Sequence, residues 1–385
     1  MKNEKLRFKR FIRASFLRRL GRPLLRQLLG RFVAELALPG DELPDETFFC
    51  SLARALSSPE ALPQELAEAL FAIDEMSGPE GQQQLEAAAA RAGLTPILEQ
   101  ESTRSDLAVR VWLADPGLLA RVHNQQRLRR LSAFECFGPA AKAGRAPFTC
   151  PDETMLARLA AALDPWFGRH QRGHNTTRLE LYPIAGDYWF LVRHGDTFTR
   201  TPTVEAQRTE IIHFRPERDD VVVYSPEHDE LRINAQTRGE RRLYVEVFGA
   251  HLHGAADWFS RRRTYTLEPL RSEGPDSLDA SGLEGLSRIV LRELELTSDA
   301  APREVLTREA ENLFRMGACA AELMPPGWRV TRAGFELHFT GQIRPRPVQI
   351  RPPNLLKLGR HCDLKLVDQW LCQRGFRVVA GSESL

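Results

Sequence analysis

Apolar residues recur every three or four positions through the first third of the chain, and this spacing predicts helices. Between residues 8 and 32 it gives a helix one apolar face and leaves arginine on the remaining surface. Gly21 and Pro23 predict a break near the middle of that helix. Shorter helices are expected over 44–135, and one more at about 153–167.

Near Arg178 the spacing changes to the two-residue alternation that is typical of β-strands. Stretches that fit short strands joined by turn residues cover 178–184, 187–200, 209–216, 219–225, 230–236 and 242–249. Parallel strands need a crossover connection, usually a helix, and these stretches have no helical pattern between them. The region therefore predicts an antiparallel β meander.

The chain after residue 263 mixes the two spacings. Strands are expected at 264–271, 286–298, 334–341 and 346–353, and helices at 302–324 and 363–375. Two passages, near 215–260 and 344–374, share a strand-to-helix pattern that hints weakly at a duplicated architecture.

These patterns predict an α+β protein with a helical N-terminal region, a central antiparallel β meander and a mixed α+β C-terminal unit. The expected division is a basic amphipathic arm (1–31), a helical domain (32–175), an antiparallel β domain (176–262) and a mixed unit (263–385) for which a winged helix is one option. Residues 138–153, rich in Gly, Ala and Pro, are the best candidate for a linker.

The composition is that of a globular protein, with 385 residues of which 42% are hydrophobic and 27% charged. No apolar run approaches the roughly 20 residues of a membrane-spanning helix. Six cysteines without a CxxC motif favour a reducing, cytoplasmic setting. All but six of the 53 basic residues are arginine, which indicates either a GC-rich bacterial genome or a surface suited to phosphate.

Charge is segregated along the N-terminal part of the chain. Residues 1–31 carry eleven basic residues against one acid, whereas residues 32–102 carry fourteen acids against two arginines. Three interpretations of the basic segment are open: a nucleic-acid-binding arm, a helix on a membrane surface, and a helix docked on the acidic segment that follows.

The string Arg193-His194-Gly195, which follows an apolar run, resembles the phosphohistidine loop of histidine phosphatases. The resemblance covers about seven residues. It implies His194 as the phosphate-accepting nucleophile, Arg193 as a phosphate clamp and a second histidine, for which His253 is the candidate. That family has a largely parallel sheet, so the predicted meander favours a plain hairpin strand at this position.

Other constellations are weaker. His170 with His174, His251 with His253, and His361-Cys362 with Cys372 fall short of three ligands, so no metal and no cofactor is predicted. A metal-dependent nuclease remains an alternative because acids cluster around one expected hairpin, although no E-x-K follows them: Asp219, Asp220, Glu227, Asp229 and Glu230.

The leading hypothesis is a non-enzymatic, cytoplasmic, bacterial interaction or adaptor protein that works with protein partners and contacts nucleic acid. The contacts are assigned to Arg7, Arg10, Arg13, Arg18, Arg19, Arg22, Arg26, Arg127, Arg129, Arg130, Arg261, Arg262 and Arg263. No small-molecule substrate is evident. A phosphoesterase centred on Arg193 and His194 is the contrasting enzymatic class.

Overall fold

The computed structural model describes residues 8–36, 38–40, 42–58, 61–98, 103–140, 148–205, 207–261, 264–316, 320–359 and 363–378. The chain folds into two compact units, Lys2–Leu128 and Arg129–Leu385. We call them the helical unit and the sheet unit. The predicted α+β class is confirmed. The basic segment and the helices after it lie in one unit, and the chain divides near residue 128 rather than near 175.

The helical unit consists of short helices with brief connections. They are α1 (Ala14–Leu20), α2 (Arg22–Leu29), η1 (Gly30–Phe32), α3 (Asp45–Ala55), α4 (Gln64–Met76), α5 (Pro79–Arg91), α6 (Thr95–Leu98), α7 (Arg104–Ala114) and α8 (Pro116–Arg129). The predicted break is confirmed: Gly21 separates α1 from α2 in a left-handed conformation, with φ of 76°, that other residues rarely adopt.

The basic segment forms part of the core of the helical unit. Phe11, Leu17 and Leu28 are fully buried there, and α1 packs against α3. Arg10 forms an ion pair with Asp74 at 3.2 Å. The described part of the segment is therefore docked on the acidic region that follows it, as one of the three interpretations expected.

The sheet unit is built on one antiparallel sheet. Its N-terminal half contains β1 (Ala133–Pro139), α9 (Glu153–Arg169), β2 (Arg178–Ile184), β3 (Asp187–Gly195), β6 (Glu217–Ser225), β7 (Glu230–Asn234), α10 (Arg238–His253) and β8 (Phe259–Ser260), with β4 (Thr199–Glu205) and β5 (Arg208–Phe214) as a separate two-stranded ribbon. The consecutive pairing of β2, β3, β6 and β7 confirms the predicted antiparallel meander.

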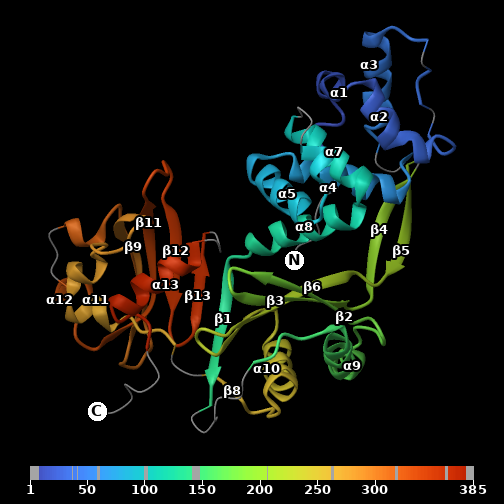
Figure 1. The fold of residues 1–385 in the computed structure, drawn as a ribbon. Coiled ribbons are helices and arrows are strands. Elements are labelled where there is room, and N and C mark those ends of the chain that lie inside the picture. Colours follow the sequence, from blue (N-terminus) through green and yellow to red (C-terminus); the bar gives the residue numbers. More distant parts are fainter. Residues whose placement is uncertain are drawn as a thin grey trace. The chain divides into compact units, whose positions relative to one another are not determined.

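The C-terminal half extends the same sheet. It contains α11 (Glu268–Ser272), η3 (Gly274–Leu278), β9 (Leu286–Ser298), β10 (Val305–Glu309), η4 (Leu313–Met316), α12 (Ala320–Leu323), β11 (Trp328–Phe339), β12 (Arg346–Arg351), β13 (Leu355–Leu358) and α13 (Leu364–Gln373). Among the described residues the strands run in the order β10-β9-β11-β12-β13-β1-β7-β6-β3-β2, and β8 also pairs with β1 (Figure 1). Both passages that hinted at duplication fold as two strands followed by a helix.

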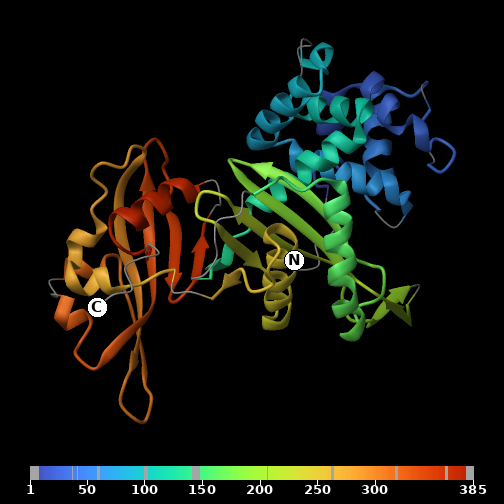
Figure 2. The ribbon, with the colours of Figure 1, turned by 60° about the horizontal axis from the view of Figure 1, so that its bottom comes forward.

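The two halves of the sheet have their hydrophobic cores on opposite faces. Phe137 of β1 belongs to the core that α9 and α10 cover, and these helices lie side by side (Figure 2). The preceding residue, Cys136, belongs to the core under α13. Because neighbouring residues of a strand point to opposite faces, β1 separates the two cores.

Several expected elements differ from the structure, and β1 covers the end of the expected helical stretch 44–135 and the start of the expected linker 138–153. Residues 242–249 were expected as a strand and form α10, and 264–271 were expected as a strand and form an isolated bridge and α11. The expected helix 302–324 contains β10, which pairs with β9, and only short helical turns after it. At the C-terminal end α13 packs on a broad sheet, an arrangement unlike a winged helix.

A buried network of charges connects the two halves of the sheet unit. Glu230 of β7 accepts bonds from Arg232 at 2.7 Å and from Arg377 at 2.6 Å. Arg377 also binds Asp368 of α13 at 2.6 Å, and His228 binds the same carboxylate at 2.8 Å. Burial alone would raise the pKa of Glu230, but the charges of Arg232 and Arg377 outweigh it and hold that pKa below its ordinary value.

Because of this network we expect the sheet unit to lose stability in acid. An unfolded glutamate titrates near pH 4.3, above the lowered pKa of folded Glu230, so the unfolded state binds the proton first. The stabilisation is complete above about pH 5 and is lost as the pH falls through the folded pKa. Urea unfolding, followed by tryptophan fluorescence from neutral pH downwards, measures the free energy of unfolding.

The variant Arg377→Met tests the origin of that dependence. It removes a cation from two buried carboxylates, which should cost about 3–5 kcal/mol at neutral pH, and it should flatten the acid dependence. Arg288→Met changes an exposed arginine of β9 and should cost less than about 0.5 kcal/mol. Equal costs for the two variants would refute the role of the network.

Candidate functional site

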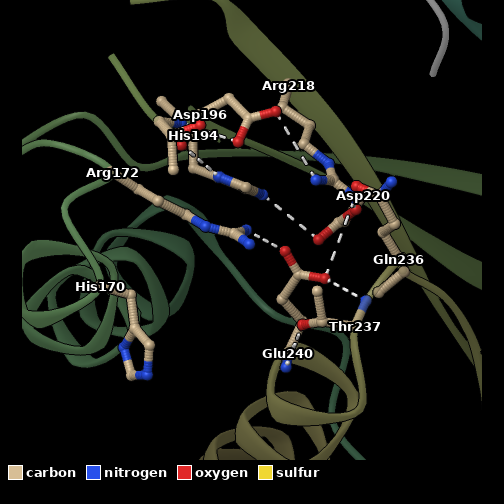
Figure 3. A network of polar contacts seen from close by, with 12 residues as sticks. His170, Arg172, His194, Asp196, Arg218, Asp220, Gln236, Thr237 and Glu240 are labelled. Atoms are coloured by element: carbon tan, nitrogen blue, oxygen red, sulfur yellow. Dashed lines mark hydrogen bonds and ion pairs between the residues drawn. The ribbon is translucent and has the colours of Figure 1, made fainter. Parts of the chain in front are cut away.

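A cluster of buried polar side chains surrounds the histidine of the Arg-His-Gly string (Figure 3). His194 lies at the end of β3, Asp220 on the neighbouring strand β6, and Glu240 in the first turn of α10. All three are buried, and one potential ligand atom from each lies within 4.8 Å of the others. Arg172 and Arg218 complete the cluster.

Both ring nitrogens of His194 face hydrogen-bond acceptors. Nδ1 lies 2.8 Å from the carbonyl oxygen of Gly195, and Nε2 lies 3.2 Å from Oδ2 of Asp220. Tyr244 donates a further bond to the same carboxylate oxygen at 2.8 Å. The two contacts of the ring form together only if a proton sits on Nδ1 and a second is shared between Nε2 and Asp220.

Glu240 holds the N-terminus of α10 and neutralises two arginines. Its carboxylate accepts a bond from the backbone N–H of Thr237 at 2.6 Å, and the Thr237 hydroxyl accepts from the backbone N–H of Glu240 at 3.1 Å. This capping box fixes the start of the helix. The same carboxylate forms ion pairs with Arg172 and, at 3.9 Å, with Arg218. Burial alone would raise the pKa of Glu240, but these bonds outweigh it and lower that pKa.

Two buried guanidinium groups already pair with the carboxylates of the cluster. Arg172 and Arg218 are positive, and they pair with the carboxylates of Glu240, Asp220 and Asp196. A divalent cation bound to His194, Asp220 and Glu240 would therefore compete with two buried guanidinium groups for the same oxygens. The arrangement favours a structural role that ties α10 to β3 and β6.

The structure does not bring together the residues that the phosphatase resemblance implies. Arg193 points to the face opposite His194 and binds Glu180 at 2.8 Å and Asp219 at 3.3 Å. His253 packs beside Tyr224 of β6. On the same strand, the residue paired with His194 is Arg218, six positions away. At roughly 3.3 Å per residue, the two histidines are therefore about 20 Å apart along β6.

The remaining features of this region have packing explanations. A Cβ atom at Gly195 would overlap the backbone carbonyl oxygen of Arg172, so this position requires glycine. His253 stacks on Trp258 with ring centroids 4.3 Å apart, and burial lowers its pKa, which keeps the ring neutral at neutral pH.

The acids that suggested a nuclease are dispersed. Asp219 binds Arg193, Asp220 belongs to the His194 cluster, and Glu227 is exposed. Asp229 accepts a bond from Tyr224, and Glu230 belongs to the network that joins the two halves of the sheet.

Two of the histidines that were considered as metal ligands have other partners. His170 stacks on Trp166, and His251 contacts the carbonyl oxygen of Val247. His361 and Cys362 lie outside the described residues. Cys50, Cys136, Cys150 and Cys372 are free thiols.

The arginines of the basic segment divide into exposed and paired groups. Arg13, Arg18, Arg19 and Arg26 are exposed, and so is Arg31, which was not among the arginines predicted to bind. Arg10 and Arg22 are partly buried and pair with Asp74 and Asp45. Within the described part of the chain, Arg13, Arg18, Arg19 and Arg31 form no ion pair with a carboxylate. We refer to these four exposed arginines together as the arginine face.

The other arginines assigned to binding are scattered. Arg127 and Arg129 are partly buried, Arg130 is exposed, and Arg261 pairs with Glu135 at 3.3 Å. Arg7, Arg262 and Arg263 lie outside the described residues.

One functional candidate was missed in the sequence. Arg104, the first residue of α7, lines a cavity of about 480 Å³ together with Arg10 and Arg19. Nothing in the local sequence of Arg104 indicates this, because the other two arginines lie more than 80 positions away. The cavity belongs wholly to the helical unit.

A second surface feature belongs to the sheet unit. The ribbon of β4 and β5 projects from the sheet (Figure 1) and exposes large apolar side chains. Val204 is 80% exposed and Phe198, just before β4, is 63% exposed. Ile211 and Ile212 point to opposite faces of the ribbon, and both are more than 40% exposed.

Comparison with known proteins adds no functional information: no family model matches the chain, and no curated protein is significantly similar to it. Among the described residues, no helix is both long and apolar enough to cross a membrane.

The structural role of the His194 cluster predicts the effect of Glu240→Gln. The variant leaves the buried Arg172 without its charged partner and removes one of the three carboxylates around Arg218, so it should cost about 3–5 kcal/mol of stability. Glu246→Gln, in the same helix, removes an exposed ion pair with Arg242 and should cost about 0.5 kcal/mol or less. Thermal unfolding measures both. A melting temperature that rises with Zn²⁺ in the wild type, and does not rise in Glu240→Gln, would instead indicate a metal site.

Proposed function

We propose that the protein is a non-enzymatic adaptor that binds nucleic acid through the arginine face of the helical unit. The observation that carries the proposal is that Arg13, Arg18, Arg19 and Arg31 are exposed and lack carboxylate partners in the described part of the chain. They project from a segment whose apolar side is buried in the core, so their backbone positions are fixed.

Aromatic rings support several of these side chains. The guanidinium of Arg18 lies 6.0 Å from the ring centroid of Phe49, and that of Arg31 lies 5.5 Å from Trp112. A guanidinium that stacks on an aromatic ring keeps its N–H donors available at its edge. Such donors match phosphate oxygens, which supply most of the affinity of proteins for nucleic acid.

The ribbon of β4 and β5 supports the adaptor part of the proposal. An isolated two-stranded ribbon with apolar side chains exposed on both faces gains little from those side chains on its own. Exposed apolar surface of this kind commonly marks a contact with a protein partner. A cytoplasmic bacterial setting belongs to the same proposal and is supported by the free thiols and the arginine-rich composition.

The burial of His194 supports a non-enzymatic protein over a phosphoesterase. Its side chain is fully buried, and its ring stacks on Phe167 with centroids 4.0 Å apart. A phosphate ester could reach the ring only after α9 had moved.

The binding proposal is tested with charge substitutions because the basic segment contributes to the core. Deleting residues 1–31 would remove Phe11, Leu17 and Leu28 and unfold the helical unit. The triple variant Arg13→Gln, Arg18→Gln, Arg31→Gln should weaken oligonucleotide binding and reduce the slope of log K against log salt by about 0.7–0.9 for each phosphate that the variant no longer neutralises. Fluorescence anisotropy with single- and double-stranded oligonucleotides over a salt series measures the slope.

A matched control removes the same charge elsewhere. Arg288, Arg303 and Arg329 are exposed arginines of the sheet unit, and their triple glutamine variant should keep the wild-type slope. Equal weakening by the two triple variants would show nonspecific attraction to the whole protein. Binding to anionic vesicles with no binding to oligonucleotides would favour the membrane-surface interpretation of the basic segment.

The apolar side chains of the ribbon should contribute little to folding. We expect Val204→Thr with Ile211→Thr to change the free energy of unfolding by less than about 0.5 kcal/mol, because both side chains face solvent. Urea unfolding of the double variant measures the change. A loss above about 2 kcal/mol would mean that these side chains are buried within the folded protein in solution, and would remove the support for a partner there.

A further inference from the structure

The cavity of about 480 Å³ in the helical unit brings together guanidinium groups from separate parts of the chain. Arg10 precedes α1, Arg19 lies near the end of α1, and Arg104 begins α7. The hydroxyl-bearing side chains of Ser77 and Ser105 also line the cavity, and Phe16 and Leu20 supply apolar wall.

Each of the three guanidinium groups is held by a neighbour. Asp74 accepts bonds from Arg10 through its carboxylate, at 3.2 Å, and through its backbone carbonyl. Gln82 accepts a bond from Nε of Arg104 at 3.0 Å. Arg19 lies 5.8 Å from the ring centroid of Phe16. Side chains held in this way lose less conformational freedom when a ligand binds.

Positive charge exceeds negative charge around this cavity. Asp74 compensates Arg10, whereas Arg19 and Arg104 have no carboxylate partner in the described part of the chain. Burial raises the pKa of Asp74, although the charge of Arg10 opposes this shift. As the pH falls, Asp74 therefore takes up a proton earlier than an exposed aspartate and ceases to neutralise Arg10. The surplus amounts to about two positive charges.

We propose that this cavity binds a phosphomonoester. A phosphomonoester carries about −1.5 to −2 charges at neutral pH, which matches the surplus, whereas an internal phosphodiester carries one. Two guanidinium groups with unused N–H donors and the hydroxyl group of Ser105 suit its three terminal oxygens, whereas the Ser77 hydroxyl donates to the carbonyl oxygen of Ile73. The volume lies within the roughly 300–1,000 Å³ of small-molecule sites, so the cavity holds the phosphate and part of the group attached to it.

If the phosphomonoester is the end of a nucleic-acid strand, this proposal rests on the proposed function. Arg19 belongs both to the arginine face and to the cavity, so a strand bound on that face can place its 5′-terminal phosphate in the cavity. The same chemistry is present in a free nucleoside monophosphate. The two sources are distinguished by experiment.

The test compares 5′-phosphorylated and 5′-hydroxyl oligonucleotides of one sequence by fluorescence anisotropy. The 5′-phosphate should tighten binding at least about tenfold, and Arg104→Gln should remove that advantage while leaving the binding of the 5′-hydroxyl oligonucleotide unchanged. Arg54→Gln, an exposed arginine of α3 outside the cavity, should keep the advantage. Melting temperatures establish that both variants fold.

Isothermal titration with adenosine monophosphate and with inorganic phosphate separates the remaining outcomes. Equal binding of the two oligonucleotides, with no binding of either small ligand, would overturn the cavity proposal and leave the proposed function standing. Binding of adenosine monophosphate that Arg104→Gln abolishes, without binding of oligonucleotides, would establish the cavity as a small-molecule site and overturn the nucleic-acid proposal. No binding of any of these probes would overturn both.

Discussion

The pairing of β1 with two strands is the interaction on which the sheet unit depends. On one edge β1 pairs with β7 and on the other with β13, which lie more than 100 residues apart in the chain. Because Cys136 and Phe137 are neighbours on one strand, their side chains enter the cores of different halves. The helices of the two halves consequently cover opposite faces, and β1 belongs to both cores.

Buried charge is the second constraint, and it accounts for the string that resembled a catalytic motif. A buried ion pair is costly unless its partners are compensated, and each network supplies several bonds to one central carboxylate, Glu230 or Glu240. His194 is one member of such a network, Arg193 serves another on the opposite face, and Gly195 allows close packing against the backbone of Arg172. Each of the three adjacent residues Arg193, His194 and Gly195 is therefore explained by a different structural role.

The sequence predicted the elements whose structure depends on the pattern of neighbouring residues. Alternation predicted β2, β3, β6 and β7, and Gly21 predicted the break between α1 and α2. Residues 242–249 form a helix in spite of their strand-forming Val and Tyr, because the capping box of Thr237 and Glu240 starts α10. The contact of His194 with Asp220 joins residues on neighbouring strands, and the cavity joins Arg10 to Arg104. No local pattern contains either one, because the fold alone brings those residues together.

Arginine has two distinct roles in this chain, and its abundance in the sequence hides the difference. Arg172, Arg232 and Arg377 are buried and neutralised, so their contribution is to connect strands and helices. Arg13, Arg18 and Arg31 are exposed without carboxylate partners among the described residues, and in their positions lysine, glutamine or alanine would leave the core intact. Buried arginine therefore serves the fold, whereas the exposed arginines of the basic segment supply the phosphate contacts that the proposed function requires.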